Sequence, residues 1–103
     1  MTGSVADSEY FERVAVGCWR RREELDGWIV KSAENWALDR VSVVDRSILR
    51  LAIFELLAEI DLPLRVIIDE AIELAKRFST EDSGRFVNGI LSALLDSVRP
   101  NSK

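Results

Sequence analysis

One stretch near the middle of the chain, VVDRSILRLAIFELL at residues 43–57, sets the architecture. Its apolar residues recur three and four positions apart, which is the period of an α-helix, and they cover too wide an arc for one stripe. A helix that is apolar on most sides is usually buried inside a bundle. Ser42 and Asp45 have the spacing of a capping box, in which each side chain bonds the other residue's amide. The stretch therefore predicts a central helix surrounded by others.

Two helical segments are predicted before this stretch. The first starts at Ser8, an acceptable N-cap, and has the apolar stripe Phe11, Val14, Ala15, Cys18 and Trp19. The second starts at about Glu24 and has Leu25, Trp28, Ile29, Ala33 and Trp36 on one side. Periodicity alone leaves open whether these are two helices or one bent helix.

Two more helices are predicted after it. Pro63 suits a first helical turn and predicts a helix over about residues 64–78. Its apolar positions are Ile67, Ile68, Ala71, Ile72, Ala75 and Phe78. Ser79 and Asp82 repeat the capping-box spacing ahead of a last helix, which Arg99 and Pro100 end. Its stripe is Val87, Ile90, Leu91, Leu94, Leu95 and Val98.

The fold class predicted from these segments is all-α, a compact bundle of about five helices. No strand-like alternation persists in the sequence. We expect a flexible lead-in at residues 1–7, a helical domain at 8–99 and a polar tail at 100–103. The length of 103 residues suits one domain with one hydrophobic core.

Composition narrows the function classes. The sequence has no histidine and one cysteine, Cys18, which excludes histidine-based triads, internal disulfides and CxxC metal sites. We expect no enzyme activity, no cofactor and no metal. No secretory signal or membrane-spanning run is visible, so a cytoplasmic location without membrane attachment is predicted. Eighteen acidic residues against 14 basic ones give a net charge of −4, whereas proteins that bind nucleic acid by general phosphate neutralisation are usually basic.

Most charged and aromatic residues favour a structural interpretation. The carboxylates of Asp69, Glu70 and Glu73 are expected to be solvated or salt-bridged. Glu55 lies inside the central apolar helix, so an arginine is expected to pair with it, and Arg50 and Arg40 are the candidates. The tryptophans Trp19, Trp28 and Trp36 could form a base-stacking platform, but their helical spacing favours core packing.

The start of the last helix is the main candidate site. Asp82, Arg85 and Phe86 fall at positions i, i+3 and i+4, so they share a face near a helix N-terminus. Free amides there suit a phosphate, and arginine beside an exposed aromatic ring suits an unstacked base. Gly89 costs helix stability relative to alanine and suggests close contact with another helix.

Three stretches in order, VVDRSILRLAIFELL (43–57), IIDEAIELAKRF (67–78) and EDSGRFVNGIL (81–91), resemble the NusB family of transcription antitermination factors. EELDGWI (23–29) matches more weakly. The resemblance implies an all-helical protein that binds boxA-type RNA together with NusE, a ribosomal protein of the small subunit, and so acts indirectly on the RNA polymerase complex. It also implies RNA contacts at Asp82, Arg85, Phe86 and Arg50, and it places Asp45 toward the NusE-binding surface.

The sequence departs from the family pattern at two places. The family usually has asparagine where this chain has Asp69. The family also begins with two further helices and an arginine-rich segment, whereas residues 1–7 contain no arginine, which is expected of a shortened protein or a fragment. The alternative function is therefore a helical protein-interaction module that has lost RNA binding. In the family, the two further helices cover part of the bundle. Without them, apolar side chains of the first two segments are expected to be uncovered, which predicts self-association as a symmetric dimer. These side chains are Phe11, Val14, Trp19, Trp28 and Trp36.

Overall fold

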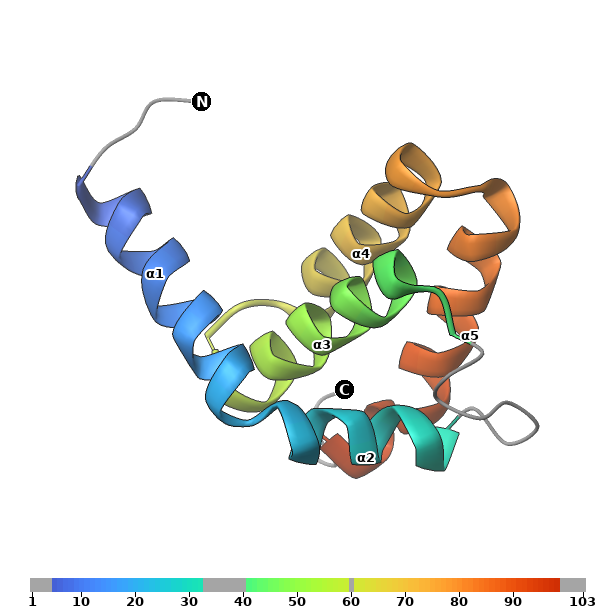
Figure 1. Cartoon of the computed structure of the whole chain (residues 1–103), viewed down its shortest axis with the longest axis horizontal. Coiled ribbons are helices and arrows are strands. Elements are labelled where there is room, and N and C mark those ends of the chain that lie inside the picture. Colours follow the sequence, from blue (N-terminus) through green and yellow to red (C-terminus); the bar gives the residue numbers. More distant parts are fainter. Residues whose placement is uncertain (1–4, 33–40, 60, 99–103) are drawn as a thin grey trace.

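The computed structural model describes residues 5–32, 41–59 and 61–98, and within these ranges it contains five α-helices and no strand. They are α1 (Val5–Arg20), α2 (Arg22–Ser32), α3 (Val43–Ala58), α4 (Leu64–Phe78) and α5 (Glu81–Val98). Figure 1 shows α3 in the middle of the bundle, with α1 on its left, α4 above it, α2 below it, and α5 running from the right toward α2. The all-α prediction is confirmed. None of the described helices is both long enough and apolar enough to cross a membrane.

Helix α3 is the central helix that the sequence predicts, and each of the other four helices contacts it. Its buried apolar residues are Ile48, Leu49, Ala52, Ile53, Phe54 and Leu56. Only half of the predicted capping box forms: the Ser42 hydroxyl accepts a hydrogen bond from the Asp45 amide at 3.0 Å. The Asp45 carboxylate instead turns toward α5, where it accepts a hydrogen bond from Ser83.

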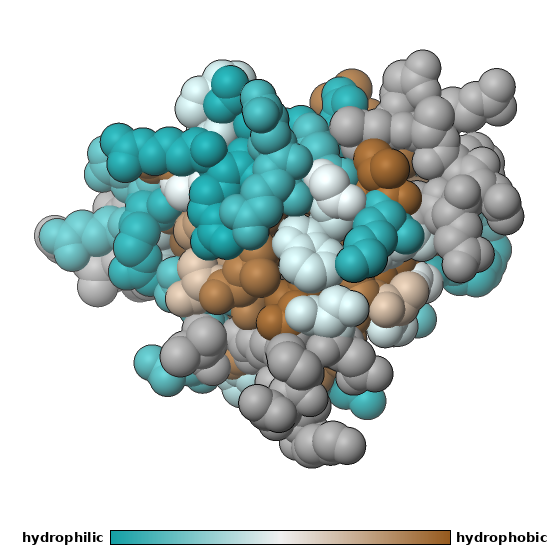
Figure 2. Space-filling model, turned by 90° about the horizontal axis from the view of Figure 1, so that it is seen from below, coloured by the Kyte–Doolittle hydropathy of each residue, from teal (hydrophilic) through white to brown (hydrophobic). Residues whose placement is uncertain are grey.

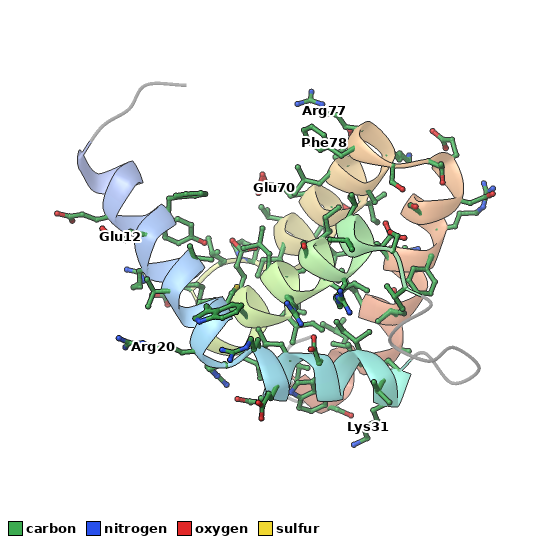
Figure 3. The ribbon with its side chains drawn as sticks, in the orientation of Figure 1. Glu12, Arg20, Lys31, Glu70, Arg77 and Phe78 are labelled. Carbon is green, nitrogen blue, oxygen red and sulfur yellow. The ribbon has the colours of Figure 1, made fainter. Side chains whose placement is uncertain are left out.

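Helices α4 and α5 complete the hydrophobic core together with α3. Helix α4 has the predicted bounds and buries Ile67, Ile68, Ala71 and Ala75 against its neighbours. Helix α5 buries Val87, Ile90, Leu91 and Leu94. Phe78 does not pack in the core as predicted, because it is the last residue of α4, at the end that extends past α3, and 62 % of its surface is exposed (Figure 3).

Helices α1 and α2 are two separate helices that meet at Arg21, and the chain bends there (Figure 1). Helix α1 begins at Val5, earlier than the predicted Ser8. In α2, Leu25 and Ile29 are buried and Trp28 packs at the edge of the core. Seen from below, the face with α2 gathers hydrophobic side chains at its centre and hydrophilic ones around them (Figure 2). The predictions for Ala33, Trp36, Arg40, Arg99 and Pro100 lie outside the described residues.

The apolar stripe predicted for α1 is only partly buried. Val14 is buried and Cys18 is half-buried, but Phe11 is 75 % exposed and Trp19 is 63 % exposed. Among the described helices, α1 contacts α2 and α3, and these two helices cover only one side of it. The prediction that Trp19 packs in the core is therefore wrong.

Candidate nucleic-acid interface

The chain begins α5 with a cap that differs from the predicted one. The Thr80 hydroxyl, rather than Ser79, accepts a hydrogen bond from a first-turn amide, that of Ser83, at 3.1 Å. The Thr80 carbonyl also accepts from the Gly84 amide at 3.2 Å, which starts the helical hydrogen-bond ladder. The acidic residues Glu81 and Asp82 occupy the first turn, where negative charge is favourable beside the helix N-terminus.

A buried polar contact ties this turn to the start of α3. The Ser83 hydroxyl donates to Asp45 Oδ2 at 3.1 Å, and Ser79 Oγ lies 2.8 Å from the same hydroxyl. Asp45 is 7 % exposed and Ser83 is 8 % exposed. The other carboxylate oxygen of Asp45 has no hydrogen-bond partner among the described residues. The N-termini of α3 and α5 are thus held side by side, and Asp45 lies beneath the surface.

The predicted site residues lie on the outer side of this turn. Arg85 and Asp82 form an ion pair and are both largely exposed, as their i, i+3 spacing implies. Phe86 is partly buried and packs against the core cluster, so its ring is less exposed than the sequence analysis expects. The three residues therefore share an accessible surface on the first turns of α5, and an arginine and an aromatic ring are available there.

Two glycines shape the same helix in different ways. A methyl group added at Gly89 would meet no atom within 4 Å, so Gly89 is open to solvent and makes no close helix contact, contrary to the prediction. Its spacing from Arg85 and Phe86 places it on their side of the helix. At Gly84, by contrast, an added Cβ would lie 3.0 Å from the Lys76 side chain. Lys76 of α4 therefore packs against α5 at Gly84, which is two residues from both Asp82 and Phe86 and so lies on the opposite side of the helix from them.

Arg50 is not part of this surface. Its guanidinium makes two hydrogen bonds to the Asp26 carboxylate, both at 2.6 Å, and so links α3 to α2. Arg50 follows Asp45 by five residues, which places them about 140° apart around the helix. The sequence did not identify Asp26 as the partner of Arg50, because the two residues are 24 positions apart and on different helices.

Comparisons with known proteins cover this surface and most of the chain. A family model described as "NusB family" matches residues 2–96. The chain belongs to the NusB family. Over 79 residues it is 54 % identical to the transcription antitermination protein NusB of Thermotoga maritima, and over 92 residues it is 45 % identical to that of Symbiobacterium thermophilum. These alignments include 77 % and 89 % of this chain.

A solved structure of T. maritima NusB has the same fold. It superimposes with a TM-score of 0.86 at 47 % sequence identity, over 90 % of this chain and 66 % of that one. The chain spans only 56 % and 60 % of the length of the T. maritima and S. thermophilum sequences. All five residues that the NusB resemblance singles out lie within the family match: Asp45, Arg50, Asp82, Arg85 and Phe86.

A second polar site of this NusB chain joins α1 to α3. The Tyr10 hydroxyl donates to Glu55 Oε2 at 2.6 Å and is thus one partner of the central glutamate. Of the two arginines predicted to pair with Glu55, Arg50 bonds Asp26 instead, and Arg40 lies outside the described residues. Burial raises the pKa of the Glu55 carboxyl, and the neighbouring charges of Glu70 and Glu59 raise it further against the Tyr10 hydrogen bond. Burial also raises the pKa of Tyr10.

The Tyr10–Glu55 pair borders a hollow of about 230 Å³ between α1 and α4, which Ile48, Leu51 and Leu74 also line. Glu70 of α4 points into the space between the two helices (Figure 3). Within the part of the chain that the structure describes, no three histidine, cysteine or acidic side chains are grouped as metal ligands would be. The start of α5 is the candidate nucleic-acid interface, because it combines the exposed Arg85 with the partly exposed ring of Phe86.

Proposed function

We propose that this chain is a NusB-type transcription antitermination factor that binds boxA-type RNA together with NusE. The proposal takes the family membership as its starting point. The observation that carries it is that an exposed arginine, Arg85, and a partly exposed aromatic ring, Phe86, lie on the same surface of α5. The role is non-catalytic and cytoplasmic, and it affects RNA polymerase only through the complex with RNA and NusE.

In this proposal the first turns of α5 hold an unpaired stretch of RNA. The Phe86 ring stacks on a base, while Arg85 contacts a phosphate near the helix N-terminus. Asp82 pairs with Arg85 in the free protein, so RNA competes with a carboxylate for that guanidinium. Affinity for RNA alone is therefore expected to be low, and NusE supplies further contacts.

Asp45 and Arg50 have supporting roles in the proposed complex. Asp45 is buried and fixes the start of α5 against α3 through Ser83, so it shapes the proposed NusE-binding surface from beneath. Arg50 is held by Asp26 and is 26 % exposed, so it offers only the edge of its guanidinium to RNA. We assign Arg85 and Phe86 the larger share of the binding energy.

An electrophoretic shift assay with boxA RNA, with and without NusE, tests the proposal. Phe86→Ala is expected to weaken the ternary complex by about 1–3 kcal/mol, the usual value of one stacked base. Arg85→Ala is expected to weaken it as well. Arg65→Ala is the matched control, because Arg65 is an equally exposed arginine with an acidic neighbour on its own helix, here Asp69 of α4.

One observation favours a second function, a protein-interaction module without RNA binding. The net charge is −4, and the one basic residue among the three predicted on α5 is already paired with Asp82. If the chain has this second function, NusE is expected to bind it, while boxA RNA is expected not to bind, either with or without NusE. An unchanged ternary complex after Phe86→Ala would also overturn the placement of RNA on α5.

A further inference from the structure

Trp19 presents an aromatic ring to solvent at the end of α1, although its spacing along the helix suits a core residue. The Arg22 guanidinium stacks on this ring, 3.8 Å from its centroid. The same guanidinium donates a hydrogen bond to the Trp19 carbonyl oxygen at 2.7 Å, which holds the arginine in place. Aromatic rings and guanidinium planes are the groups on which proteins stack unpaired bases. The pair therefore has the chemistry of a base-stacking site.

A hollow beside Trp19 has room for one base. Its volume is about 190 Å³, roughly the liquid volume of six water molecules, so it can take a flat ring system but not a helix. It is lined by Ala15, Cys18, Trp19, Ser47 and Arg50. Because the Arg22 guanidinium occupies the space against one part of the indole, the hollow meets another part of the ring. A base that enters it can stack on the indole, and the Ser47 hydroxyl can hydrogen-bond to the edge of that base.

The helical turns around this hollow carry an excess of positive charge. Their arginines are Arg20, Arg22, Arg46 and Arg50. Arg46 precedes Arg50 by four residues, so the two lie on the same side of α3. Figure 3 shows Arg20 pointing outward at the end of α1. The nearby carboxylates are Asp26, which pairs with Arg50, and the exposed Glu23. The arginines outnumber them in a chain whose net charge is −4, and this local excess suits the phosphates of a nucleic acid.

We propose that Trp19 and the hollow beside it form a second RNA contact, in which an unpaired base stacks on the indole between α1 and α3. This inference rests on the proposed function and extends it, because the start of α5 holds another part of the same strand. Arg50, which lies away from the α5 surface, belongs to this second contact. Arg46 links the two contacts, since it directly follows Asp45, whose carboxylate is bonded to the start of α5. The strand thus passes from α5 across the first turns of α3 to Trp19.

Binding of labelled boxA RNA to the chain with NusE, measured by fluorescence anisotropy, tests the second contact. Trp19→Ala is expected to weaken RNA binding by about 5- to 150-fold, the loss of one stacked base. Trp19→Phe keeps an aromatic ring and should recover most of the affinity, and neither variant should change NusE binding without RNA. Phe11→Ala is the matched control, because Phe11 is an even more exposed aromatic residue of α1 that does not line the hollow. This control should bind RNA as the parent chain does.

Photochemical cross-linking locates the stacked base. The boxA RNA is prepared with 5-iodouracil at one uracil position at a time, irradiated in the complex with NusE, and the cross-linked peptide is identified by mass spectrometry. We expect one position to cross-link to Trp19 and a different position to Phe86. An intact ternary complex whose affinity does not change in Trp19→Ala, or whose cross-links on this chain fall at Phe86 alone, would overturn the second contact and leave the proposed function standing. A parent chain that binds NusE but no RNA would overturn both.

Discussion

Helices α1 and α5 have similar lengths, 16 and 18 residues, yet they are buried to very different extents. Helix α5 places Val87, Ile90, Leu91 and Leu94 in the core, and each is at most 4 % exposed. Among the side chains of α1 that the structure describes, Val14 alone is fully buried, while the two largest apolar ones, Phe11 and Trp19, face solvent. Amphipathic sequence is therefore not sufficient for burial, because a helix is covered only where neighbouring helices lie against it.

The helices of this small domain therefore contribute unequally to its stability. The apolar residues of α3, α4 and α5 are enclosed by one another and supply most of the core. Helix α1 contributes less to that core, and its Phe11 and Trp19 side chains are largely exposed. Four experiments test how far this division holds.

The largest expected contrast is between Leu91→Ala and Phe11→Ala. Leu91 is fully buried, so its truncation is expected to lower the free energy of unfolding by about 2–5 kcal/mol through lost burial and a residual cavity. Phe11 is mostly exposed in the monomer, so its truncation is expected to change stability by no more than about 0.5 kcal/mol at concentrations where the chain is monomeric. Urea denaturation measures both. Equal losses would contradict the division between the two helices.

Gly17→Ala tests the contact of α1 with α3. An added Cβ at Gly17 would lie 2.3 Å from the ring of Phe54, which is buried in the core and cannot move aside freely. We expect a loss of about 1–3 kcal/mol in thermal or urea unfolding, the usual cost of overpacking. A variant as stable as the parent would mean that α1 is not seated on Phe54.

Gly89→Ala is the same change with the opposite expected sign. Nothing lies within 4 Å of the added methyl group, so the variant is expected to gain about 0.5–1 kcal/mol from the better helix former. Gly27→Ala in α2 is the control, since Gly27 is also open, and it should be stabilised similarly. If RNA approaches α5 closely at Gly89, only Gly89→Ala should also weaken the complex with boxA RNA and NusE. A loss of stability in Gly89→Ala would show that this helix face is covered.

Glu55→Gln has the smallest expected effect and tests the polar link between α1 and α3. Burial raises the pKa of Glu55, so the folded state binds this proton more tightly than the unfolded state. The parent chain therefore loses stability as the pH rises above the ordinary glutamate value of about 4.5. Glutamine can still accept the Tyr10 hydrogen bond but has no charge to bury. The variant should be the more stable one at pH 7, and the difference should shrink toward pH 4.5. A difference that does not vary with pH would contradict this account.

Local periodicity predicted most of the fold. The capping residue Ser42, the turn at Pro63 and the stripe of α5 all depend on neighbours within a few positions, and each was placed correctly. The sequence could not show which sides of α1 are covered, because that depends on the packing of distant helices. Phe11 and Trp19 have the spacing of core residues but no helix in the described structure lies over them.

The candidate site was likewise predictable where it depends on local spacing, and not where it depends on contacts between helices. The shared face of Asp82, Arg85 and Phe86 follows from their spacing, and the structure retains it. The pairing of Arg50 with Asp26, of Glu55 with Tyr10 and of Asp45 with Ser83 each joins two helices. No local pattern marks such partners, so those contacts came only from the structure.

The single thiol of the chain provides a kinetic probe of α1. Cys18 is half-buried between α1 and α3, and its Sγ lies 3.8 Å from the Arg50 carbonyl oxygen. Burial raises the pKa of this thiol to about 11, so only about one molecule in ten thousand carries the reactive thiolate at pH 7. When α1 lifts from α3, the thiol regains the ordinary acidity of cysteine and reacts far faster. The rate of alkylation at Cys18 therefore reports how often α1 opens while the rest of the bundle stays folded.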